Sequence, residues 1–123
     1  MNMSTTAAHP AGAGPLHAQT SHLVALMTIG ALALDLWRAE QAATELHDIY
    51  VRKLRRYEAM HGSIKGALNP RNHEHVAIVS YTMDEKAALT AARRKVYAAR
   101  RRLRAACAKA ARVGATNAGG AHG

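Results

Sequence analysis

Residue types that stabilise many common folds are scarce in this chain of 123 residues. Phenylalanine is absent, aromatic residues make up only 4% of the sequence, and Cys107 is the single cysteine. One cysteine cannot form an intrachain disulfide, which excludes the class of small secreted domains held together by disulfides. Residues that favour strands are also few. Alanine dominates the apolar residues instead, and its small side chain can fill only a narrow gap between closely packed helices.

The apolar residues that remain recur at helical spacing, three and four positions apart. The run of this kind that begins at Thr82 extends to Val113 without glycine or proline. With Leu89 at heptad position a, the a and d positions of this run hold Leu89, Ala92, Val96, Ala99, Leu103, Ala106, Ala110 and Val113. Because the d positions are mostly alanine, the partner helix must come close. The sequence therefore predicts an all-α fold, a long antiparallel helical hairpin within residues 21–113.

Breaks in this pattern predict where the helices begin and end. Residues 1–20 and 114–123 are small and polar, with prolines or glycines, and are expected to be disordered tails. Ser21 is expected to cap the first helix, which is either continuous or interrupted near Gly30 or Ala39–Thr44. Thr82 and Glu85 have the spacing of a capping box for the last helix.

The connection between the helices, about residues 61–83, is expected to be irregular or to contain a short strand. It holds several residues that break helices: Gly62, Gly66, Asn69 and Pro70. Residues 75–82, with the sequence HVAIVSYT, are the β-branched cluster of the chain. This cluster is expected to be a strand paired across a dimer or, preferably, an extended segment packed on the helices.

The positive charge is concentrated in one part of the chain. The formal net charge is +9, yet residues 86–123 contain ten Lys and Arg and no acidic residue. Since guanidinium groups bind phosphate through paired hydrogen bonds, this segment predicts a non-catalytic nucleic-acid-binding protein, for DNA or RNA, with weak sequence specificity. An ordinary solvated helix face from an arginine-rich genome is the alternative explanation. The residues expected to contact phosphates are Arg93, Arg94, Lys95, Arg100, Arg101, Arg102, Arg104 and Lys109.

A second basic cluster lies near the end of the first helix, at Arg52, Lys53, Arg55 and Arg56. Acidic residues lie close by in the sequence, so we expect a mixed, solvated face in which Glu45, Asp48 and Glu58 pair with the cluster.

The first helix offers a different function, binding to another protein. The residues expected to bind the partner are Leu23, Leu26, Met27, Leu34 and Trp37. In this alternative the chain is a helical structural, adaptor or regulatory protein, which a phage could encode. The first helix has a further apolar stripe at Leu46, Ile49, Tyr50, Leu54, Tyr57 and Met60. This stripe, the a and d positions of the last helix and the segment expected to bind the partner exceed what one hairpin can cover, so we also expect a homo-oligomer. A membrane partner is not expected, because the apolar run Leu23–Leu34 is shorter than a bilayer span.

Motifs for catalysis or for a cofactor are missing from the sequence. It has no glycine-rich phosphate loop, Gly-x-Ser-x-Gly elbow, CxxC or HExxH motif. His73 and His75 have a two-residue spacing but no clear third ligand, so no metal is expected. We therefore expect no enzymatic activity, no cofactor and a cytoplasmic location, in a bacterial cell or a phage-infected host.

Overall fold

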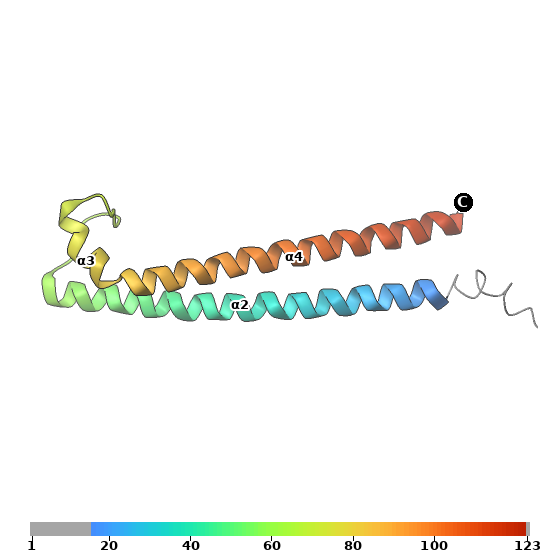
Figure 1. The fold of residues 1–123 in the computed structure, drawn as a ribbon, viewed down its shortest axis with the longest axis horizontal. Helices are drawn as coiled ribbons and strands as arrows, with labels where there is room; N and C mark the ends of the chain where they lie inside the picture. The colour runs from blue at the N-terminus through green and yellow to red at the C-terminus, as the bar shows by residue number, and fades with distance from the viewer. Residues whose placement is uncertain (1–15, 123) are drawn as a thin grey trace, which may run out of the picture. The chain divides into compact units, whose positions relative to one another are not determined.

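The computed structural model describes residues 16–122 of the chain (Figure 1). Helix α2 spans Ala18–His61 and helix α4 spans Met83–His122. Between them lie a 3-10 helix, η2, at His73–His75 and a short helix, α3, at Val76–Tyr81. No residue from 16 to 122 lies in a strand. The predicted all-α class is confirmed. Of the tail expected for residues 1–20, residues 1–15 lie outside the described residues, and residues 18–20 belong to α2.

The chain divides into two compact units. Unit 2 is Leu36–Ala99, and it contains the second half of α2, the connection, α3 and the beginning of α4. Unit 1 contains α2 as far as Asp35 and α4 from Arg100 onward. Each unit therefore takes one segment from each long helix.

The core lies in unit 2 and is built largely from α4. Its buried residues are His75, Ile78, Thr82, Leu89, Ala92, Val96 and Ala99. The last four are consecutive a and d positions of the predicted heptad. In unit 1, the next four such positions, Leu103, Ala106, Ala110 and Val113, are half-buried, while their neighbours at Arg101, Arg104 and Lys109 are exposed. The predicted register is confirmed from Leu89 to Val113.

The β-branched cluster at residues 75–82 is helical, so both a strand and an extended segment were wrong predictions. Asn72 begins this helical stretch, because its side-chain oxygen accepts a hydrogen bond from the backbone N–H of Glu74 at 2.9 Å. His75, Ile78 and Thr82 then continue the heptad spacing of α4 backwards and are buried. Burial of these residues on one side outweighs the weak strand preference of the cluster.

The predicted capping box at the start of α4 is also wrong. The Thr82 hydroxyl donates to the carbonyl oxygen of Ile78 at 2.8 Å, back into α3. The Glu85 carboxylate instead accepts two hydrogen bonds from Lys53 Nζ, each of 3.0 Å. Both side chains are therefore engaged by other elements, although the Thr82 carbonyl still accepts the first α4 hydrogen bond, from Lys86 N–H at 2.9 Å.

The start of α2 and the end of α4 differ from the prediction, whereas the end of α2 agrees with it. Helix α2 is continuous and begins at Ala18, so Ser21 lies inside it and does not cap it. It ends as expected at Gly62, whose φ of +92° favours glycine and whose N–H reaches the Glu58 carbonyl at 2.7 Å. Helix α4 continues through Gly114 to His122 rather than stopping there, since Gly114 does not adopt the positive φ of a helix-ending glycine.

The Lys53–Glu85 pair joins α2 to α4 within unit 2 and predicts a pH effect. Hydrogen bonds from Lys53 hold the pKa of the Glu85 carboxyl below its ordinary value. The pair therefore stabilises the fold above the unfolded-state pKa of about 4.3, and this contribution is lost as the pH falls through the lower folded-state pKa.

Glu85→Gln is expected to lower the stability of the protein at pH 7, and this effect is expected to shrink as the pH falls below about 4.3 and through the lower folded-state pKa. Urea unfolding followed by circular dichroism measures the stability at each pH. Asp84→Asn, which removes the neighbouring exposed carboxylate, is the matched control. A Glu85→Gln deficit of equal size at pH 7 and pH 3 would contradict the role given to this pair.

Candidate nucleic-acid interface

All eight basic residues predicted to contact phosphates are exposed on helix α4. Arg93, Arg94 and Lys95 are exposed in unit 2, and the other five are exposed in unit 1: Arg100, Arg101, Arg102, Arg104 and Lys109. Their exposure follows from the heptad register, because they flank the buried a and d positions. Seven of them make no ion pair with any residue in the described part of the chain: Arg93, Arg94, Lys95, Arg101, Arg102, Arg104 and Lys109.

The second basic cluster, on α2, differs from the predicted mixed face. Its lysine, Lys53, pairs with Glu85, and Glu58 Oε2 accepts a hydrogen bond from the Ile64 N–H at 3.2 Å. Within residues 16–122, none of the three arginines of the cluster pairs with Glu45, Asp48 or Glu58; these arginines are Arg52, Arg55 and Arg56. All three are exposed. Unit 2 therefore carries exposed basic residues on both long helices.

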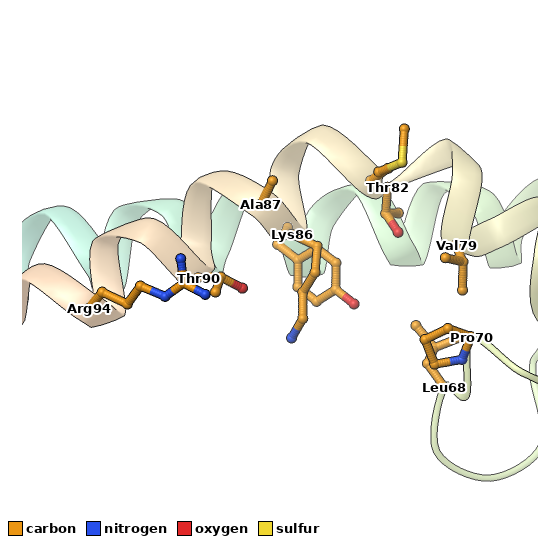
Figure 2. A pocket seen from close by; sticks show the side chains of 10 residues that line it. Leu68, Pro70, Val79, Thr82, Lys86, Ala87, Thr90 and Arg94 are labelled. Atoms are coloured by element: carbon orange, nitrogen blue, oxygen red, sulfur yellow. The ribbon is translucent and has the colours of Figure 1, made fainter.

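A groove of about 510 Å³, which Arg94 lines, lies in unit 2 (Figure 2). Lys86, Thr90 and Arg94 line it along one side of α4, and Leu68 and Pro70 come from the connection. The remaining lining residues are Tyr50, Val79, Thr82, Met83 and Ala87. None of these described lining residues is acidic, so the groove combines an apolar surface with two cations.

Lys86 is the basic residue of this groove that sequence reasoning missed. Its ammonium lies 5.2 Å from the centroid of the Tyr50 ring, a distance typical of a cation–π interaction. The signal that could have found it is the spacing of Lys86, Thr90 and Arg94, four residues apart on one helix face. The two cations are separated by about 12 Å along the helix axis, from the standard rise per residue.

Tyr57 and Tyr81 pack inside unit 2, whereas Tyr97 is exposed. Tyr57 and Tyr81 have ring centroids 5.5 Å apart, and Lys53 Nζ lies 4.8 Å from the Tyr81 ring. Both tyrosines are half-buried. Tyr97, on the second turn after Thr90, is exposed on α4.

The five residues expected to bind a protein partner are exposed on α2. Their exposed fractions are 58% for Leu23, 48% for Leu26, 66% for Met27, 45% for Leu34 and 57% for Trp37. They lie in a helix that is long and apolar enough, by length and composition, to cross a membrane. The half-buried residues of the same stretch lie on another side of the helix: Ala25, Ile29, Leu32 and Leu36.

The histidines and the cysteine form no metal centre in the part of the chain that the structure describes. No group of three or more potential ligands occurs there. His75 is buried, and its Nδ1 accepts a hydrogen bond from the Asn69 N–H at 3.0 Å, whereas His73 is exposed. Cys107 is exposed on α4.

Comparison with known proteins adds no relative to this picture: the chain matches no protein-family model, no curated protein and no solved structure.

Proposed function

We propose that this chain is a small, non-catalytic protein that binds nucleic acid through its phosphates, using the basic residues of α4. The observation that carries the proposal is the set of seven exposed Lys and Arg side chains on one helix that make no ion pair within residues 16–122. Like charges three and four positions apart weaken a helix. A polyanion would remove that repulsion and release its own counterions, which favours binding.

The proposal includes the antiparallel hairpin of α2 and α4 as the scaffold. Two contacts in unit 2 support opposite helix directions, since Lys53 pairs with Glu85 and the earlier residue Tyr50 contacts the later residue Lys86. In unit 1, α2 and α4 line a common groove, with Ala25 on one side and Ala106 on the other. Within each unit, such a scaffold would support that unit's segment of α4 along a nucleic-acid backbone.

Weak sequence specificity follows from the side chains that α4 offers. Base recognition in the major groove relies on Asn, Gln, Arg and Lys that point at base edges. Between Met83 and Val113 the helix has no Asn or Gln. Its arginines would instead contact phosphates, which position a protein on the duplex but do not read its sequence. The groove with Lys86 and Arg94 would extend the positive surface in unit 2.

Fluorescence anisotropy on duplex DNA, single-stranded DNA and RNA tests this function. We expect binding to all three at 50 mM salt, little dependence on base sequence, and a large loss of affinity at 200 mM salt. Each oligonucleotide is measured in two unrelated sequences of equal length as a control for specificity. Absence of binding at 50 mM salt would contradict the proposed function.

A second candidate function is supported by the exposed apolar side chains on α2. In this reading the chain is an adaptor that binds another protein through Leu23, Leu26, Met27, Leu34 and Trp37. Leu26→Asp with Leu34→Asp would then abolish capture of the protein partner and leave nucleic-acid binding unchanged. Capture that survives this double substitution would contradict the adaptor function.

A further inference from the structure

We propose that the outer face of α2 binds the same face of a second copy of this chain, with the two helices antiparallel. The outer face is defined as Leu23, Leu26, Met27, Gly30 and Leu34, all within unit 1. This proposal does not depend on nucleic-acid binding. It assigns a second copy of this chain as the partner of four of the five exposed apolar residues of the second candidate function: Leu23, Leu26, Met27 and Leu34.

The first step is that α2 is apolar on two sides. Ala25, Ile29 and Leu32 are half-buried within unit 1. Met27 follows Ala25 by two residues, about 200° around the helix, and is 66% exposed. A helix that is apolar on all sides is normally covered on all sides. The outer face therefore has the composition of a buried surface.

The spacing of the outer face fits another helix. Leu23, Met27, Gly30 and Leu34 follow one another at intervals of four, three and four residues. This is the alternation of a and d positions that packs two helices side by side. Gly30 weakens a helix interior relative to alanine, and no atom of the described residues lies within 4 Å of a Cβ built there. No contact among residues 16–122 of one copy requires so small a residue at this position.

Packing against an antiparallel second copy would require a small residue at position 30. Positions a and d face each other in antiparallel pairs, so Leu23 of one copy lies opposite the partner subunit's Leu34, and Met27 lies opposite the partner subunit's Gly30. The long methionine side chain then fills the space that glycine leaves. Two-fold symmetry repeats both contacts, which makes the face complementary to itself.

The charges of this helix favour a protein copy over a lipid surface. Helices that lie on anionic membranes carry Lys and Arg on their polar side. From residue 16 to 37 the chain has no Lys or Arg, and it has one acidic residue, Asp35. The same lack of charge suits a membrane span, and α2 is long and apolar enough for one. A span is disfavoured because α2 shares a groove in unit 1 with α4, whose Lys109 lines it, and a bilayer around α2 would have to take in that charge. An uncharged identical face of a second copy meets neither difficulty.

Sedimentation equilibrium of the full chain without nucleic acid tests the dimer. We expect a species of twice the 13.2 kDa chain mass. Met27→Glu is expected to weaken dimerisation by at least about 100-fold, because a dimer would bury two carboxylates without partners. Met60→Glu, at another exposed methionine of α2, is expected to have no effect. A wild-type monomer at all concentrations, or equal masses for the two variants, would overturn the proposal.

Cross-linking tests the antiparallel direction separately. In a chain with Cys107→Ser, oxidation of a mixture of Leu23→Cys and Leu34→Cys copies is expected to give a covalent dimer of one copy of each. Each variant alone is expected to give little product. Cross-linking of one variant to itself would overturn the antiparallel arrangement, and a monomer that binds vesicles of anionic or neutral lipid would overturn the choice of partner.

Discussion

Replacing Leu89 by alanine is expected to lower the free energy of unfolding by about 3 kcal/mol. Leu89 is 1% exposed and occupies position a of the first buried heptad of α4. The substitution removes buried methyl groups and leaves a cavity. In a core of few large side chains, that is a large fraction of the total stability.

The control for Leu89→Ala is Val76→Ala in the same unit. Val76 is exposed on α3, so its truncation is expected to change stability by less than about 0.5 kcal/mol. Urea unfolding of both variants, with circular dichroism as the signal, gives the comparison. Equal costs for the two variants would contradict the placement of Leu89 in the core of unit 2.

Reversing two charges on α4 is expected to weaken binding to duplex DNA by about 30-fold or more at 0.15 M salt. Each phosphate contact contributes roughly 1 kcal/mol through counterion release at this salt concentration, so two lost contacts give that factor. The variant is Arg101→Glu with Arg102→Glu. Both side chains are exposed, and glutamate is a good helix former, so the fold should be unchanged.

A matched variant distinguishes the loss of phosphate contacts on α4 from the effect of a lower net charge. Lys65→Glu with Arg71→Glu changes the net charge by the same amount, and both residues are exposed in the connection rather than on α4. Its affinity for duplex DNA is expected to fall severalfold at most. If the two double variants bind equally well, total charge and not α4 determines affinity.

The register of α4 could be predicted from the sequence because it repeats. Leu89, Val96 and the alanines between them follow one period of seven, and each period constrains the next. The exposure of the flanking arginines then follows without further information. This is why the basic residues of α4 were correctly placed on the surface, although their binding function stays a prediction.

The connection could not be predicted, because its structure depends on contacts distant in sequence. The Thr82 and Glu85 spacing fits a capping box locally, but Lys53, 32 residues earlier, engages Glu85. The groove beside Lys86 depends on where the connection places Leu68 and Pro70, and no periodic pattern encodes that position. On α2, spacing identified an apolar stripe at Leu23 and Met27 but could not show that the chain packs another side of the helix.

The measurement that tests the central claim most directly is the salt dependence of duplex DNA binding for the wild-type chain and the two double variants. If about six basic residues of α4 contact phosphates, the slope of log K against log salt concentration is about −5. The account predicts a slope of about −3.5 for Arg101→Glu with Arg102→Glu, because two contacts are lost, and an unchanged slope for Lys65→Glu with Arg71→Glu. A wild-type slope near zero, or the same slope for all three proteins, would contradict it.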